Sequence, residues 1–161
     1  MLLTLVAAAC ASCLMPPEYE VAPNINQPVS IDESKLAVAP DFYAWSGCDQ
    51  PTLAFDITQA LSNPDDDELT IVWLVNYEAG NQQSIDALDA LEFELAVCFQ
   101  PKITEGALQP NSIEVHVFDR KPKSLNNADD ALTPIEGSDT TTASAKWYLA
   151  VEDRTCCVEL N

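Results

Sequence analysis

Basic side chains are scarce in this sequence. Its 161 residues contain 7 Lys and Arg against 26 Asp and Glu, which gives a formal net charge of −19. Recognition of nucleic acid depends on clusters of Lys and Arg that neutralise phosphates, and the sequence has no such cluster. Anionic lipid headgroups would repel the chain for the same reason. The composition therefore argues against nucleic acid as a partner and predicts an acidic, well-solvated surface.

Catalytic motifs are missing as well. The sequence has no G-x-S-x-G element, no glycine-rich phosphate loop and no H-E-x-x-H motif. A Ser–His–Asp site would have to use His116, the single histidine, which lies beside Glu114 on the outward face of a predicted strand. Glu92 and Glu94 share one strand face, where a solvated surface explains them better than a catalytic carboxylate pair. We predict that the protein is not an enzyme and needs no cofactor.

The body of the chain lacks C-x-x-C pairs, which argues against a zinc site. It has an even number of cysteines, which indicates two disulfides and an oxidising compartment. Three pairings are open. A bond within the adjacent C-terminal pair is the least favoured, because successive residues of a strand point to opposite faces. The disulfide candidates are Cys48, Cys98, Cys156 and Cys157.

The first thirteen residues, MLLTLVAAACASC, form an apolar run that ends in small residues and cysteines. A run this short cannot span a bilayer, but it has the small-residue exit of a secretory signal. The segment resembles the lipobox of bacterial lipoproteins, in which the cysteine is lipidated and becomes the mature N-terminus. The resemblance implies that residues 1–9 are a lipoprotein signal segment and that Cys10 is the lipidated residue, with Cys13 as the alternative. The competing interpretation is a buried N-terminal strand or helix of a cytosolic protein.

A proline-rich stretch follows the cysteines. Five prolines between residues 16 and 40 disfavour helix and favour extended, hydrated backbone. We therefore expect residues 10–40 to be the lipidated cysteine and a linker, although residues 34–40 could form an edge strand. The two residues directly after Cys10 are Ala11 and Ser12, and neither is Asp. By analogy with lipoprotein sorting, this points to the outer membrane, with the protein facing the periplasm or the exterior.

Apolar and polar residues alternate with a period of two through most of residues 41–161. Residues 91–100, 112–118 and 145–153 each place apolar side chains on one face, which is typical of half-buried strands. Residues 69–77 are apolar on both faces, as in a central strand. Breaks rich in Pro, Asn and Asp separate these segments, and Ser84–Leu91 could be a short helix. The pattern predicts an all-β antiparallel sandwich of five to seven strands.

Residues 63–75 read NPDDDELTIVWLV, an acidic turn followed by an apolar strand. The stretch resembles the D-P-D-x-D-x-L-x-x-x-W element of PKD-like and cadherin-like immunoglobulin-type sandwiches. Asp65 and Asp67 match the turn of that element, and Trp73 matches the tryptophan that enters the core. The resemblance implies an immunoglobulin-like fold but no particular function.

The acidic turn offers oxygen ligands of the kind that Ca²⁺ prefers, at Asp65, Asp67 and Glu68. Asp and Asn also stabilise tight turns by bonding to nearby backbone amides. The chain has no second acidic motif at a matching interval and no EF-hand loop. A turn without metal is therefore the preferred interpretation, and a calcium site is the alternative.

Together these observations predict a membrane-anchored envelope lipoprotein whose β-sandwich is a non-catalytic interaction or structural module. Its partners would be other envelope proteins, and it would contact the membrane through the lipid anchor alone. The alternative is a small ligand-binding protein for a glycan or Ca²⁺ at the periplasm or cell surface. An enzyme is the least favoured class, because the sequence contains none of the catalytic motifs named above.

Overall fold

The computed structural model describes residues 26–46, 50–106, 109–119, 122–133, 142–155 and 157. Strands dominate this part of the chain, and its helical elements include a 3₁₀ turn and one short α-helix. In chain order the elements are β1 (Ser30–Ile31), η1 (Glu33–Lys35), β2 (Phe42–Ser46), β3 (Thr52–Asp56), β4 (Leu61–Ser62), β5 (Thr70–Val75), β6 (Ala87–Leu88), β7 (Glu92–Ala96), β8 (Asn111–Phe118), α1 (Ala128–Leu132) and β9 (Thr142–Asp153). None of the described helices is long and apolar enough to cross a membrane.

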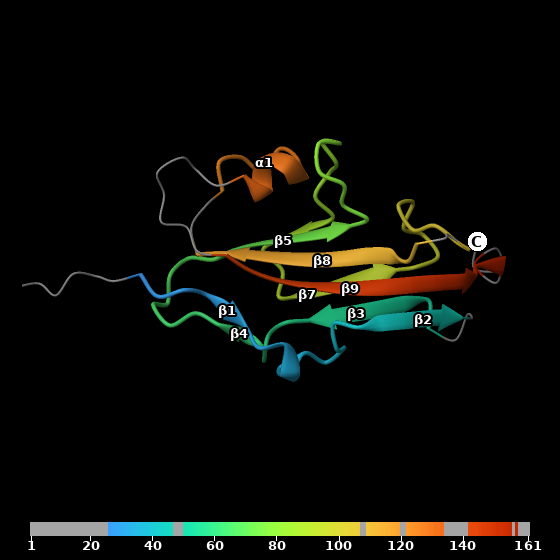
Figure 1. The fold of residues 1–161 in the computed structure, drawn as a ribbon, viewed down its shortest axis with the longest axis horizontal. Helices are drawn as coiled ribbons and strands as arrows, with labels where there is room; N and C mark the ends of the chain where they lie inside the picture. The colour runs from blue at the N-terminus through green and yellow to red at the C-terminus, as the bar shows by residue number, and fades with distance from the viewer. Residues whose placement is uncertain are drawn as a thin grey trace, which may run out of the picture.

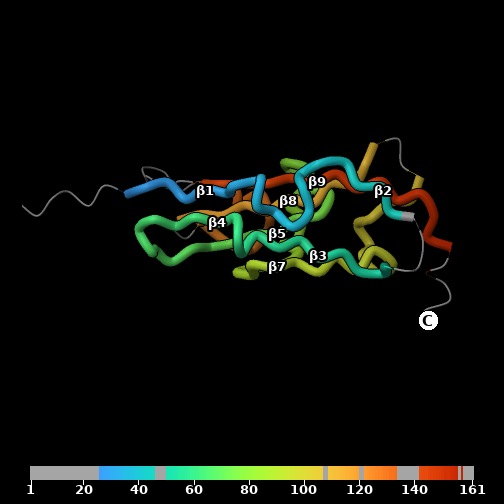
Figure 2. Tube along the Cα trace, turned by 90° about the horizontal axis from the view of Figure 1, so that it is seen from below, coloured from blue at the N-terminus to red at the C-terminus, as the bar shows by residue number. Residues whose placement is uncertain are grey.

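Five strands form the main sheet, in the order β2-β9-β8-β5-β6. The edge strand β2 runs parallel to β9, whereas the other neighbours in this sheet are antiparallel. Two smaller antiparallel pairs complete the fold, β3 with β7 and β1 with β4. The strands follow the long axis of the molecule, with α1 beside β5 (Figure 1), and the β3–β7 pair lies on the opposite side from β9 and β2 (Figure 2).

The predicted all-β sandwich is confirmed. Nine strands occur in the described residues, and three of them (β1, β4 and β6) have only two residues. The six longer strands agree with the five to seven expected from the alternating pattern. One feature departs from the expectation of antiparallel strands, because β2 enters the main sheet parallel to β9.

The core lies between the main sheet and the β3–β7 pair, and tryptophan dominates it. The Trp73 ring stacks on Phe93 of β7 at 5.4 Å between ring centroids and on Trp147 of β9 at 5.9 Å. Trp147 in turn lies 5.2 Å from Phe55 of β3. Trp73 is completely buried, as the sequence predicts. The two layers are therefore joined by a continuous cluster of aromatic rings, in which each pair contributes about 0.5–1.5 kcal/mol beyond its buried area.

A second, smaller core covers part of the outward face of the main sheet. Val72 and Leu74 of β5 are buried on this face against Ala128 and Ala131 of α1, with Phe118 beside them. All six residues of β5 are consequently buried. This arrangement confirms that the segment apolar on both faces is a central strand.

Residues assigned to the linker contribute to the sandwich. Val29 and Leu36 are buried in the main core, and β1 pairs with β4. Residues 34–40 hold part of the 3₁₀ turn η1 and no strand, so the strands of this region are β1 and β2 on either side. The packed domain therefore includes residues before 41. Its prolines do not prevent this, because their extended backbone can lie along a core surface.

The helix expected over Ser84–Leu91 is absent, and this prediction is wrong. The segment is extended and contains β6. The strand β6 pairs with only two residues of β5, and the aspartates on either side of β6 accept from the next donors, Val75 N–H to Asp86 at 2.8 Å and Ile71 N–H to Asp89 at 3.3 Å. Backbone donors at the sheet edge need partners, and these side chains satisfy them. The helical spacing of the apolar residues in Ser84–Leu91 does not indicate that Asp86 and Asp89 accept hydrogen bonds from β5.

Candidate binding cleft

The outward face of the main sheet carries one row of side chains that crosses three strands. Tyr148 of β9 is the register partner of Phe42 on β2 and of Ser112 on β8. Asn76, just after β5, continues the row, since its N–H donates to the Ser112 carbonyl at 2.8 Å. The inward neighbours Trp147 and Leu149 are buried in the core, which fixes the position of Tyr148 on the outside.

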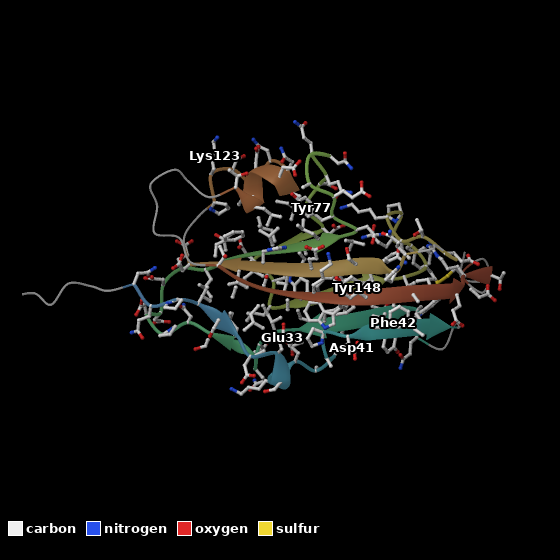
Figure 3. All side chains as sticks on the ribbon, viewed as in Figure 1. Glu33, Asp41, Phe42, Tyr77, Lys123 and Tyr148 are labelled. Atoms are coloured by element: carbon white, nitrogen blue, oxygen red, sulfur yellow. A yellow bond between two sulfur atoms is a disulfide. The ribbon has the colours of Figure 1, made fainter. Side chains whose placement is uncertain are left out.

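Two aromatic rings in this row are open to solvent. Phe42 is 60% exposed and Tyr148 is 42% exposed. Figure 3 shows the two side by side on neighbouring strands, with Tyr148 between Phe42 and Tyr77. The Lys146 ammonium lies 5.5 Å from the centroid of the Tyr148 ring, within range of a cation–π interaction. The sheet thus presents a paired aromatic surface.

A polar cleft of about 550 Å³ lies over the same row. Its floor is formed by Ser112, Lys146 and Tyr148, and its walls by the loop after β5 and the loop before β8. A second hollow of about 240 Å³ reaches Phe42 on β2 and shares four wall residues with the first, Thr104, Gln109, Pro110 and Asn111. The two hollows together extend from the β5 loop to the edge strand.

The first wall, residues 77–83, is held by one carboxylate of α1. Asp129 accepts hydrogen bonds from the Tyr77 hydroxyl at 2.7 Å, from Gly80 N–H at 2.9 Å and from Gln82 N–H at 2.8 Å. These bonds, that from Gly80 first, lower the pKa of Asp129. Burial and the bond to Asp129 raise the pKa of Tyr77 to about 12. The loop is therefore tied to the helix rather than free in solvent.

The second wall, residues 102–106, is braced from the C-terminal end of the chain. Cys98, which precedes this wall in the chain, forms a disulfide with Cys157. The Arg154 guanidinium donates to the carbonyls of Cys98 at 2.6 Å and Ile103 at 2.9 Å. Asn111 closes the wall onto β8, where its side chain accepts from Thr104 N–H at 2.8 Å. The wall is therefore fixed both covalently and by charged hydrogen bonds.

Charges in the cleft are largely compensated. Lys102 pairs with Asp86 at 2.6 Å, and Lys146 pairs with Glu114 at 2.7 Å. Burial raises the pKa of Glu114, but hydrogen bonds and charge from His116 and Lys146 outweigh it and lower that pKa to about 2. Glu114 is therefore ionised across the physiological range and neutralises the lysine beside it.

His116 and Ser112 do not form a nucleophilic pair. The Ser112 hydroxyl donates to one oxygen of Glu114 at 3.3 Å, and His116 Nε2 lies 3.3 Å from the other. The carboxylate thus lies between serine and histidine. Nucleophilic catalysis requires the imidazole to contact the hydroxyl directly, so this order of groups is not a Ser–His–acid triad. Glu92 and Glu94 are exposed on β7, in the other sheet.

The acidic turn makes hydrogen bonds to protein groups. Asp65 accepts from both the backbone N–H and the side-chain amide of Gln27. Asn63 donates to the Asp67 carbonyl at 2.8 Å, and Asp66 has a φ of 55°, a conformation that Asp tolerates in turns. Across the described ranges, no group of three His, Cys, Asp or Glu side chains, Glu68 included, is arranged to hold a metal ion.

The Cys98–Cys157 disulfide is one of the bonds that the even cysteine count predicts. It excludes the disfavoured bond between the adjacent cysteines. The other two body candidates, Cys48 and Cys156, lie outside the described residues, as do the lipidation candidates Cys10 and Cys13.

Sequence reasoning missed both exposed rings of the cleft. The sequence does contain an indication of Tyr148, because this residue occupies an outward position in the alternating segment 145–153. A large aromatic ring at an exposed position suggests a binding role. The sequence contains no such indication of Phe42, since the position of this ring depends on the parallel pairing of β2 with β9. The two residues are 106 positions apart in the chain, and only the register brings them together.

Comparisons with known proteins found no match, so the function has to be inferred from the geometry of the site. No family model matches the chain, no curated protein matches it, and no solved structure matches its fold.

Proposed function

We propose that this chain is a membrane-anchored envelope lipoprotein whose β-sandwich is a non-catalytic binding module. The observation that carries the proposal is the pair of exposed rings, Phe42 and Tyr148, beside a polar cleft. Large exposed rings that lie together on a folded domain mark interaction sites, because solvation alone gives no reason to keep them outside. The partner docks on the outward face of the main sheet.

The design of the cleft supports binding rather than chemistry. Each lysine of the cleft is paired with a carboxylate, and the serine and histidine of the floor region are separated by Glu114. Both walls are held by hydrogen bonds, and one by a disulfide as well, so the site is formed before a partner arrives. A preformed site saves the entropy that ordering loops would cost on binding.

The anchor and the immunoglobulin-like identity belong to the same proposal. Lipidation of Cys10, or of Cys13, would attach the chain to the outer membrane, and the segment between this anchor and Asn26, which bonds to Asp119 of the domain, would act as a tether. The buried Trp73, which stacks on Trp147 in the core, supports the resemblance to PKD-like and cadherin-like sandwiches, in which the tryptophan of this strand enters the core. Other envelope components are the expected partners.

Site-specific photo-crosslinking in cells tests the binding surface. A photoreactive phenylalanine replaces Tyr148 in one full-length variant and Phe99 in the control, since Phe99 is 58% exposed and lines neither hollow. We expect adducts of higher mass from position 148 and none from position 99. Equal adducts from both positions, or none from position 148, would contradict the proposed surface.

The anchor is tested separately by mass spectrometry of the mature N-terminal peptide. We expect an acylated cysteine at position 10. An intact, unacylated Met1 would refute the lipoprotein part of the proposal and leave the binding surface standing.

A further inference from the structure

We propose that the cleft on the main sheet binds a neutral glycan, with Tyr148 and Phe42 as its stacking platform. This inference rests on the proposed binding function and names the ligand class. Three features of the site carry it: two exposed rings, a polar lining with both donors and acceptors, and lysines whose charge is already neutralised by carboxylates.

The exposed rings fit the apolar face of a sugar. A pyranose ring presents a flat patch of polarised C–H groups on one side and hydroxyls around its rim. The face of an aromatic ring carries negative charge density, which attracts such C–H groups. Phe42 and Tyr148 are register partners on adjacent strands, so their backbones lie about 4.8 Å apart. Two neighbouring rings of this kind offer a continuous surface to a sugar chain rather than one isolated contact.

The polar groups around the rings match hydroxyls. Asn76 and Asn111 are occupied in holding the walls together. Other groups remain available: the amide of the exposed residue Gln109, the ammonium protons that Lys146 does not use on Glu114, and the one that Lys102 does not use on Asp86 and the Ser84 carbonyl. An ammonium has three donors and an amide has donors and an acceptor. A sugar hydroxyl both donates and accepts, so it can pair with each of these groups.

The charge balance selects a neutral chain over a polyanion. Lys102 and Lys146 are already neutralised by Asp86 and Glu114, which leaves no excess positive charge for carboxylate or sulfate groups. The net charge of −19 would also repel a polyanion at a distance. Proline-rich peptides are the main rival occupant of aromatic grooves. Such a peptide offers mainly carbonyl acceptors, whereas a sugar hydroxyl can also donate to the amide oxygen of Gln109.

Affinity electrophoresis tests the inference with defined probes. The full-length protein runs in native gels that contain hydroxyethyl cellulose, galactomannan or dextran, with polygalacturonate as the anionic comparison. We expect at least one neutral polysaccharide to retard the wild type and polygalacturonate to leave it unretarded. Tyr148→Ala and Phe42→Ala should each weaken the interaction by about tenfold or more, since stacking on an aromatic ring is typically worth that much. Phe99→Ala should behave as wild type.

The outcomes separate the two proposals. Both substituted rings are on the surface, and circular dichroism melts of the variants confirm that they fold. Absence of retardation by every neutral polysaccharide, equal retardation of the Tyr148→Ala variant, or binding of a proline-rich peptide alone would overturn the glycan assignment. Specific crosslinks at position 148 would in that case keep the binding function. Absence of both crosslinks and retardation would refute the binding function as well.

Discussion

Trp73 is the residue on which the stability of this sandwich depends most, and its replacement by Ala has a calculable cost. The side chain is completely buried, stacks on Phe93 and Trp147, and donates its indole N–H to the Ala90 carbonyl at 2.8 Å. It therefore links the main sheet to β7 and to the segment that precedes it. Removal leaves a cavity bounded by two aromatic faces and a carbonyl without its donor.

The magnitude follows from these contacts. Truncation of a buried tryptophan costs about 3–5 kcal/mol, which already includes the lost burial and the cavity. The lost indole hydrogen bond accounts for about 1 kcal/mol of this cost. Because domains of this size are stable by about 5–15 kcal/mol, Trp73→Ala should bring the fold close to unfolding. Trp73→Phe keeps a ring between Phe93 and Trp147 but loses the N–H, so it should cost about half as much.

Urea denaturation followed by far-UV circular dichroism measures both variants. Tyr148→Ala serves as the control, because an exposed ring on the outward face should change stability by at most about 0.5 kcal/mol. The expected order of destabilisation is Trp73→Ala, then Trp73→Phe, then Tyr148→Ala. A loss below about 1 kcal/mol for Trp73→Ala, or a loss equal to that of the control, would refute the assignment of Trp73 to the core between the layers.

Three further predictions concern charges and cross-links. Because the folded pKa of Glu114, about 2, lies below the ordinary value of 4.5, its stabilising effect is complete above about pH 5 and is lost as the pH falls toward 2. Glu114→Gln should therefore cost about 1–2 kcal/mol at pH 7, a figure reduced for the exposure of its lysine partner, and almost nothing near pH 2 in urea titrations; an equal loss at both pH values would contradict this. Loss of the Cys98–Cys157 disulfide, which closes 59 residues, should cost up to about 4 kcal/mol and weaken binding in the cleft, and alkylation of the wild type in denaturant without reductant should label no body cysteine. Asp65→Asn with Asp67→Asn should change stability little, and neither this variant nor the wild type should melt higher with calcium than with chelator; a wild-type rise of several degrees that the variant lacks would establish a calcium site.

The sequence predicts the inner face of the sandwich well. Alternation places Val115 and Leu149 inward, and both are buried. Trp73 is buried as expected, and the strand that is apolar on both faces is central, because α1 covers its outer side. These successes share one physical cause. A period of two in hydrophobicity is a local property, and burial of the apolar face is the dominant favourable contribution to folding.

The failures arise where distant partners decide the outcome. Residues 84–91 have the spacing of a helix, but they pair with β5 through β6, and Asp86 and Asp89 on either side of β6 accept from N–H groups of β5. Val29 is buried in the core because β1, directly after it, pairs with β4 about thirty residues further along the chain. The cleft depends on β2, which pairs in parallel with a strand at the other end of the chain. No local pattern encodes such a pairing, so neither the aromatic platform nor the cleft could be predicted.

The geometry of β9 connects stability to the proposed binding function. Trp147 and Leu149 are fixed in the core, and Tyr148 between them must then face outward at a set position. The core therefore sets the position of the cleft floor, whereas the walls are loops that hydrogen bonds and a disulfide hold in place. A site on a rigid strand with braced loops can bind without reorganisation. Changes in the wall loops should consequently alter which ligand is preferred, while changes at Tyr148 should weaken every ligand alike.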